Sequence, residues 1–405
     1  MKKIPFYIQI LIALVAGILC GSLLPGGAKW IAWLGKLFMN ALCMLIVPVI
    51  FFSISTSVQG ICDKGGSSLG RIGAKTIGLY VVTMILAIAT GIILVNIIRP
   101  GAGVSTTLIG SEAAQASVSA TDTIASIIPS NIFEAFTHNN TIPIIFISIL
   151  VGYFVTKISD EGKGAVGRFL RGGYELTLKV MEVIIRFAPL GIFAILWTQF
   201  AQVSDVLGLI HNMLMYIVTV TAGLLFHTFI TLPLLLRFVA KVHPWQHFRN
   251  MGVPLLTAFS TASSGATIPL TLAAVKEKDG VSSGVADFVI SLGATINMNG
   301  AALLECVAVI FIAQAYGIDL TISQMLMVSG VSLLCAIGSA GIPMSAMVMM
   351  AVILNAVGLP VEGIGLVIGV DRILDMLRTS VNVYGDTCVA VMVAKSEKEQ
   401  LTIDR

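Results

Sequence analysis

Charged residues are scarce in this chain. They make up 11% of its 405 residues, whereas 57% of the residues are hydrophobic. A soluble domain needs a largely polar surface and cannot hide so large an apolar fraction. The formal net charge of +3 is also small, which argues against a nucleic-acid partner. The shortage of charge therefore predicts a protein that lies within a lipid bilayer.

Motifs for tightly bound metals and cofactors are lacking as well. The six cysteines are scattered in apolar surroundings with no CxxC pair, so we expect buried free thiols. The five histidines form no metal-like constellation. His243 and His247 have helical spacing, but they lie in a basic stretch beside Pro244, so we expect them at the surface. We expect no cofactor.

Long apolar runs are what the sequence has instead. Runs such as Ile8 to Leu24 and Ile77 to Ile98 are long enough to cross a hydrocarbon core of about 30 Å. The first run follows Lys2 and Lys3 as a signal peptide would, but it has no convincing cleavage site and many spans follow it, so we interpret it as the first helix. We expect an all-α polytopic membrane protein with eight full-length spans, near residues 5–24, 30–58, 69–98, 141–157, 172–200, 207–238, 281–315 and 360–395.

Basic residues mark one side of this predicted topology. They gather in alternate connections, which is the bias that cytoplasmic loops carry. The connections on the other side hold only Lys29 and Arg99, with no basic residue between Gln202 and Leu209. We therefore expect both termini in the cytoplasm. The basic connections contain Lys2 and Lys3; Lys64, Arg71 and Lys75; Lys157, Lys163, Arg168 and Arg171; and Arg237, Lys241 and Arg249.

Two further apolar regions, 245–277 and 320–354, are interrupted by small residues and proline. Lys276 and Lys278 follow the first region, so it is expected to enter and leave the membrane on the cytoplasmic side, as a re-entrant hairpin. Parity places the second on the opposite side. Each tip combines small residues with Ile-Pro, where the proline is expected in the first turn of a half-helix. Such paired interruptions in opposite orientation indicate a transporter binding site, although small residues also simply allow close helix packing. The tips read SSGATIP over 263–269 and GSAGIP over 338–343.

The last span carries the strongest chemical signal. At 100° per residue, five polar residues between positions 371 and 386 fall within about 80° of one another. Charges inside a membrane are costly unless they are paired or hydrated, so a structural ion-pair network is one interpretation. Acids exceed bases on this face, however, and bound cations explain that excess better. The five residues are Asp371, Asp375, Arg378, Asn382 and Asp386.

Each of these side chains suits part of an amino acid or its coupling ions. Asp375 suits an ammonium group, and Arg378, one helical turn away, suits a carboxylate held bidentately. Asn382 and Asp386 offer oxygen ligands for a hard cation such as sodium. The seventh span adds the polar break NMNG at 297–300. Glu305 follows within an apolar run and is either a proton carrier or a structural acid with a partner.

These motifs resemble those of the glutamate/aspartate transporter family, the dicarboxylate/amino acid:cation symporters. The resemblance covers essentially the whole chain and is most specific at TASSG (261–265), NMNG (297–300) and the stripe 371–386. It implies a glutamate-transporter fold with inverted repeats, a homotrimer in the inner membrane, and elevator movement of a transport domain. Scaffold helices would lie in 1–68 and 128–200, an extracytoplasmic loop in 99–127, and the transport domain in 69–98 and 201–405.

The resemblance also implies roles for individual residues. Asp375 would bind the substrate amino group and Arg378 its side-chain carboxylate. The rest of the substrate shell would be Ser263, Ser264, Ile342, Thr379 and Asn382. One sodium site would use Gly293, Asn297, Asn382 and Asp386, a second would use backbone carbonyls near Thr295, Ala336, Ile337 and Ser339, and a third would involve Tyr80 and Thr83. Glu305 occupies the position of the family's proton-carrying glutamate.

Some positions depart from the family pattern. The break usually reads Asn-Met-Asp-Gly-Thr, but here Asn299 replaces the aspartate and Ala301 the threonine, while Met84 stands where serine is common. Losing a carboxylate and a hydroxyl weakens a sodium site that depends on oxygen ligands and charge. The arginine that family members place at 262 or 376 is absent, because Ala262 and Met376 stand there. Because the third sodium site is weakened and Glu305 is present, we expect coupling to fewer sodium ions plus a proton.

Other functions fit less well. An intramembrane aspartyl protease would need Tyr-Asp and Gly-x-Gly-Asp motifs, which are missing, and Gly70 to Thr76 lacks the Gly-Lys pair of a nucleotide-driven pump. A passive anion channel stays open as an alternative. Among substrates, Ala301 favours a neutral amino acid, but a buried Arg378 needs an anionic partner. A C4-dicarboxylate would leave Asp375 unpaired, so an acidic amino acid is the favoured substrate.

Overall fold

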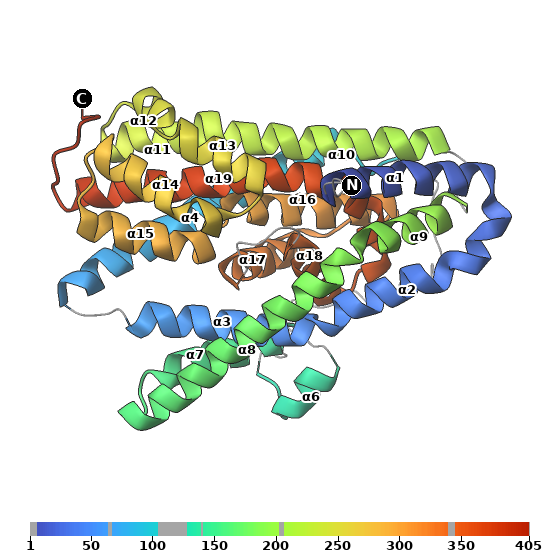
Figure 1. Cartoon of the computed structure of the whole chain (residues 1–405), viewed down its shortest axis with the longest axis horizontal. Coiled ribbons are helices and arrows are strands. Elements are labelled where there is room, and N and C mark those ends of the chain that lie inside the picture. The colour runs from blue at the N-terminus through green and yellow to red at the C-terminus, as the bar shows by residue number, and fades with distance from the viewer. Residues whose placement is uncertain are drawn as a thin grey trace, which may run out of the picture.

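The computed structural model describes residues 6–63, 67–103, 128–138, 141–201, 206–338 and 345–404. Within these ranges the secondary structure is helical, apart from one isolated bridge between Val242 and Asp404. Most helices run roughly along the long axis of the molecule (Figure 1). Most of the predicted loop 99–127 lies outside the described residues, as do Ser339 and Ile342.

The first half of the chain forms one group of packed helices. α1 and α2 both pack on α9, while α3 packs on α7 and α8 (Figure 1). The short α6 precedes α7 and packs on it. The helices of this group are α1 (Phe6–Leu23), α2 (Ala28–Met44), α3 (Ile46–Asp63), α6 (Ile132–Thr137), α7 (Thr141–Val155), α8 (Asp160–Arg186) and α9 (Ala188–Phe200).

α4 (Ser67–Ile98) belongs with the helices of the second half, because it packs on α16 and α10. α19 runs through the middle of this second group and contacts α13, α14, α15 and α16 (Figure 1). The other helices of the group are α10 (Val206–Phe226), α11 (Leu232–Leu235), α12 (Pro244–Asn250), α13 (Gly252–Thr261), α14 (Ser264–Glu277), α15 (Ser283–Ile296), α16 (Asn299–Ala315), α17 (Ile322–Gly338), α18 (Ser345–Ala356) and α19 (Gly365–Ser396).

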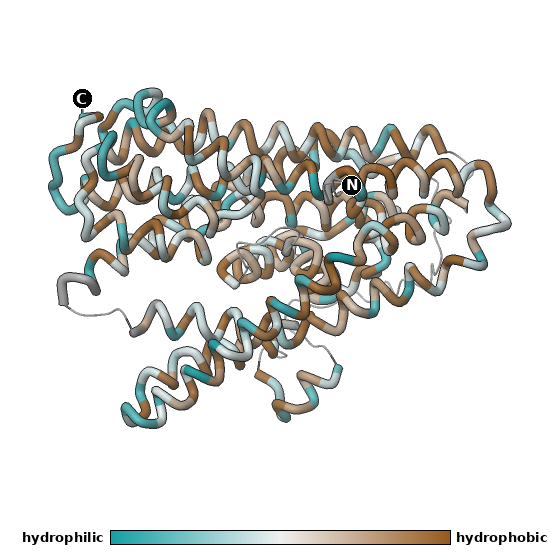
Figure 2. Tube along the Cα trace, in the orientation of Figure 1, coloured by the Kyte–Doolittle hydropathy of each residue, from teal (hydrophilic) through white to brown (hydrophobic). Residues whose placement is uncertain are grey.

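Helices occupy all eight predicted spans, although their suitability for crossing a membrane differs. Four stretches are long and apolar enough by themselves: 25–60, 71–98, 206–240 and 283–315. α8 and α9 make a fifth if they count as one span. α1 and α7 are shorter apolar helices, and α19 is 32 residues long but carries the predicted charges. Figure 2 shows hydrophobic residues along the helices and hydrophilic ones gathered at the end that holds the C-terminus.

Prolines accompany irregularities in three of the spans that were expected to be continuous, and one of these is a sharp bend. α8 and α9 meet at 56°, at Phe187, and Pro189 stands in the first turn of α9. Pro48 follows the junction of α2 and α3 in the same way. Pro233 lies between two π-helical segments, His227–Thr231 and Leu236–Ala240. Proline has no N–H to donate and its ring clashes with the preceding turn, so the helix bends or widens there.

The two predicted hairpins are both present as helix pairs. α13 packs against α14, and α17 packs against α18. The first pair turns at Ala262, which has a left-handed backbone (φ 50°), and at Ser263. α14 begins at Ser264, so Pro269 lies in the second turn rather than the first turn expected from the sequence. The expectation was wrong because Ser263 caps the helix, accepting a hydrogen bond from Ala266 N, and thereby starts it earlier.

Candidate functional site

The polar stripe of α19 is buried along its whole length. Its five predicted residues are between 0% and 3% exposed. Arg378 Nη2 donates to Asp375 Oδ1, and Thr379 Oγ1 donates to the same oxygen at 3.5 Å. Arg372 Nη1 donates to Asp375 Oδ2 at 3.2 Å. Asp375 therefore interacts with two guanidinium groups. Arg372 was not among the predicted residues, although its i, i+3 spacing from Asp375 could have revealed the pair.

Arg378 still has hydrogen-bonding capacity. Among the described residues, its Nε and Nη1 atoms are buried with no acceptor. Both carboxylate oxygens of Asp371 and both of Glu305 are likewise buried and have no donor within the described part of the chain. Arg378 interacts electrostatically with Asp375, Asp371 and Glu305. The arrangement is a buried guanidinium with donors to spare, surrounded by acids.

The break between α15 and α16 holds the second polar cluster. α15 ends at Ile296 and α16 begins at Asn299, as the NMNG motif predicted. Asn297 Nδ2 donates to Asp386 Oδ1 at 2.9 Å, which joins the break to α19. Thr83 Oγ1 of α4 lies 3.4 Å from Asn297 Oδ1 and 3.3 Å from Asn299 Oδ1. Three separated parts of the sequence thus supply neutral oxygens and one carboxylate to one buried place.

Gly293 allows Asp386 to come close. A Cβ atom at position 293 would lie 2.5 Å from Asp386 Oδ1 and 2.7 Å from the Tyr80 hydroxyl. Side-chain atoms cannot approach so closely, so only glycine fits without a shift of its neighbours. Tyr80 donates its hydroxyl proton to Val289 O at 2.6 Å. The structure therefore brings together Tyr80, Thr83, Gly293, Asn297 and Asp386 of the predicted set.

Asn382 has a more specific place than the sequence indicated. Its Oδ1 atom accepts hydrogen bonds from Gly300 N at 2.8 Å and Ala301 N at 3.4 Å. These N–H groups belong to the first turn of α16, where no intrahelical acceptor exists. The side-chain oxygen is thus engaged at the helix N-terminus, so a cation bound to Asn382 would need its backbone carbonyl.

The remaining predicted residues lie outside these two polar clusters. Ser264 is buried at the tip of the α13–α14 pair. Thr295 is exposed and its Oγ1 atom donates to Leu292 O at 3.0 Å, leaving its carbonyl as the group of interest. Ala336 is buried near the end of α17, and Ile337 O accepts from Ser57 Oγ of α3 at 3.4 Å. The second predicted sodium site is therefore only partly described, because Ser339 lies outside the described residues.

The expectation for His247 was wrong. Its side chain is fully buried, with Nδ1 at 2.7 Å from Asp279 Oδ2 and Nε2 at 3.1 Å from Thr387 Oγ1. Asp279 provides the partner that allows a polar ring to be buried. No sequence pattern indicates this pair, because the two residues are separated by a whole hairpin. His243, in contrast, is exposed as expected.

Comparison with known proteins decides the family. The model of the sodium:dicarboxylate symporter family matches residues 6–396. The chain belongs to this family. The proton/sodium-glutamate symport protein of Bacillus caldotenax is 34% identical over 414 aligned residues, 98% of this chain and 96% of that protein. The proton/glutamate-aspartate symporter of Escherichia coli is 34% identical, over 98% of this chain and 94% of its own. An excitatory amino acid transporter of Caenorhabditis elegans is 31% identical, over 96% and 87%.

This sodium:dicarboxylate symporter family member is a multi-pass membrane protein and a cation-coupled symporter, not an enzyme. Family membership also implies the glutamate-transporter fold that the motifs predicted. Among the described residues, no three His, Cys, Asp or Glu side chains gather as a metal-binding group. The buried oxygens near Asp386 are mostly neutral, which suits a hard monovalent cation better than a transition metal.

Proposed function

We propose that this protein imports an acidic amino acid, glutamate or aspartate, together with sodium ions and a proton. Arg378 is the observation that carries the proposal. It is 3% exposed, and its Nε and Nη1 atoms have no acceptor among the described residues. A buried guanidinium needs an anionic partner, and the N–H groups along one edge of the guanidinium form a planar fork that matches one carboxylate. The relatives named for glutamate and aspartate support the same choice.

The rival substrates satisfy this site less completely. A neutral amino acid has no side-chain carboxylate and would leave the free donors of Arg378 buried without a partner. A C4-dicarboxylate such as succinate would satisfy Arg378 but would bring no ammonium group to Asp375. Asp375 already accepts from Arg372 and Arg378, so an incoming ammonium would share that carboxylate. The ammonium and second carboxylate of an acidic amino acid suit both residues.

We assign the first sodium ion to the place where Asp386 meets the break between α15 and α16. Asp386 supplies charge, Asn297 supplies a neutral amide oxygen, and Gly293 leaves room for the carboxylate. Tyr80, Thr83 and Asn299 surround a further site that lacks the family's carboxylate. The backbone carbonyls near Thr295, Ala336 and Ile337 would form another sodium site. Glu305 is our candidate for the proton, since it is buried and has no hydrogen-bond partner among the described residues.

We further propose that the two helix groups are the scaffold and the transport domain of an elevator. The scaffold would comprise residues 1–68 and 128–200, and the transport domain 69–98 and 201–405. The clustering of α4 with α10 and α13 to α19 supports this division. Assembly as a homotrimer in the inner membrane, with both termini in the cytoplasm, completes the proposal. The hydrophilic end near the C-terminus supports that orientation (Figure 2).

Uptake by purified protein in proteoliposomes tests the substrate and the ions together. With an imposed sodium gradient, we expect saturable accumulation of labelled aspartate, which a passive channel would not give. Unlabelled glutamate should compete strongly, whereas serine and succinate should compete weakly, and removal of sodium should abolish uptake. Competition by serine as strong as that by glutamate would instead support a neutral amino acid transporter. Equal competition by succinate would support a dicarboxylate symporter.

A further inference from the structure

His247 and Asp279 form a buried pair that the substrate and cation sites do not use. Both side chains are fully buried. Asp279 Oδ2 lies 2.7 Å from His247 Nδ1. Asn250 Nδ2 donates to Asp279 Oδ1 at 2.7 Å, and Thr402 N donates to the Asp279 backbone carbonyl at 3.0 Å. Both oxygens of the Asp279 carboxylate are thus engaged, Oδ1 by Asn250 and Oδ2 by His247.

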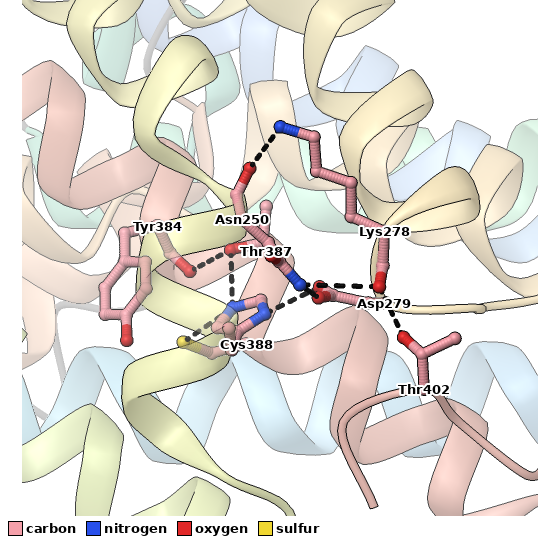
Figure 3. Close-up of polar contacts among 8 residues, drawn as sticks. Asn250, Lys278, Asp279, Tyr384, Thr387, Cys388 and Thr402 are labelled. Carbon is pink, nitrogen blue, oxygen red and sulfur yellow. Dashed lines mark hydrogen bonds and ion pairs between the residues drawn. The ribbon is translucent and has the colours of Figure 1, made fainter.

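The other edge of the imidazole contacts one turn of α19. His247 Nε2 lies 3.1 Å from Thr387 Oγ1 and 3.7 Å from Cys388 Sγ. The ring of His247 also stacks on Tyr384, with centroids 5.5 Å apart and an interplanar angle of 29°. Figure 3 shows Tyr384 and Cys388 on the left of the cluster and Asp279 on the right, with Thr387 between them. One histidine therefore touches three residues within five positions of α19.

Asp386 lies within that same turn but faces the opposite way. At 100° per residue, its side chain is about 160° from that of Tyr384 around the helix axis. It points instead to Asn297 and to the close approach at Gly293. The turn is therefore held by His247 on one side and presents the proposed cation ligand on the other.

We propose that His247, held by Asp279, is a positioning residue for the cation site. By hydrogen bonding to Thr387 and stacking on Tyr384, it fixes the rotation and height of the α19 turn that carries Asp386. This inference rests on the proposed role of Asp386 as a cation ligand. Partners outside the ligand shell that orient a ligand typically change metal affinity by about 10- to 100-fold. Because His247 acts through the helix backbone, we expect the low end of that range.

The experiment measures the sodium concentration that gives half-maximal aspartate uptake by the full-length protein in proteoliposomes. His247→Phe keeps an aromatic ring against Tyr384 but removes both hydrogen bonds. We expect its half-maximal sodium concentration to rise roughly 10-fold, with the maximal rate at saturating sodium nearly unchanged. His247→Gln retains an amide that can reach Thr387 and should recover part of the sodium affinity. Asp279→Asn, which loses the charge that holds the ring, should fall between wild type and His247→Phe.

Two further variants make the outcome decisive. His243→Phe changes the exposed histidine one turn earlier and should behave as wild type. Asp386→Asn tests the cation site itself: if it leaves sodium dependence unchanged, the proposed sodium assignment is wrong. If Asp386→Asn shifts sodium dependence while His247→Phe and Asp279→Asn do not, the positioning role is overturned. It is also overturned if the His247 and Asp279 variants lower only the maximal rate, because that is the effect of a purely structural pair.

Discussion

Replacement of Arg378 by glutamine is the most direct perturbation of the proposed substrate site. Two nitrogen atoms of Arg378, Nε and Nη1, carry N–H groups with no acceptor in the described part of the chain. In the proposed complex the substrate side-chain carboxylate accepts from two N–H groups on one edge of the guanidinium, at least one of them on Nε or Nη1. Charge-assisted hydrogen bonds contribute about 1.5–3 kcal/mol each, so two contribute about 3–6 kcal/mol. At about 1.4 kcal/mol per factor of ten, aspartate affinity should fall roughly 10²- to 10⁴-fold.

The assay is sodium-driven uptake of labelled aspartate and labelled serine in proteoliposomes. Serine has no side-chain carboxylate, so its uptake should be unchanged or improved in Arg378→Gln, because a neutral amide replaces the buried charge. A reversed preference between aspartate and serine distinguishes loss of the carboxylate contact from a general loss of folded, active protein. Arg99→Gln is the control, since Arg99 is an exposed arginine that pairs with Asp319 at the end of α4.

Undiminished aspartate accumulation by Arg378→Gln would refute the assignment of the carboxylate to this arginine. A loss of aspartate and serine uptake by the same factor would refute it as well, because the charge pair predicts discrimination between the two substrates. Arg372→Gln adds a further comparison. Arg372 also bonds Asp375, but only its Nε is a buried donor lacking an acceptor among described residues, so a smaller loss of aspartate affinity is expected.

Three other predictions concern coupling and stability. In Glu305→Gln, an inward proton gradient should no longer stimulate uptake, while sodium-driven uptake should persist; flux at fixed sodium and varied external pH measures this. In Asn299→Asp, a carboxylate returns beside Thr83, so the sodium dependence of uptake should become steeper, as seen in its Hill coefficient. Hydrogen bonds from Lys75 and then Arg71 lower the pKa of Glu397 below 4.5. Their stabilising effect should be complete above that pH and lost as pH falls through the lowered pKa, and thermal melting of wild type against Glu397→Gln should show this difference.

The α19 stripe could be predicted from the sequence because it depends on helical periodicity alone. A run from 371 to 386 without proline forms a continuous helix, so the spacing of Asp375, Arg378 and Asp386 fixes which face they share. The helix break at Asn297 was equally predictable from the sequence, since two asparagines interrupt an apolar run. These features are local. They required no knowledge of how distant segments pack.

Features that depend on packing between distant segments were not predictable. No pattern near His247 in the sequence predicts its contact with Asp279. The spacing of the α19 stripe likewise does not predict that Asn382 Oδ1 accepts from the N-terminus of α16. The bend at Phe187 could have been inferred from Pro189, but by length and hydropathy the two helices together still resemble one span. Placing Pro269 in the first turn failed because Ser263 offers a stronger start signal for the helix. In each case a tertiary or capping contact outweighed the pattern.

The charges of the buried site explain why transport requires cations. Glu305, Asp371, Asp375 and Asp386 are at most 2% exposed, and they outnumber the two arginines of α19 that adjoin them. An acidic amino acid adds one further negative charge to the same enclosed space. Burying unbalanced charge is costly, so the loaded site becomes favourable only when sodium ions or protons enter with the substrate. Under the proposed function, coupling therefore follows from charge balance: Arg378 would select the anion, and the excess of carboxyl groups would require the cations.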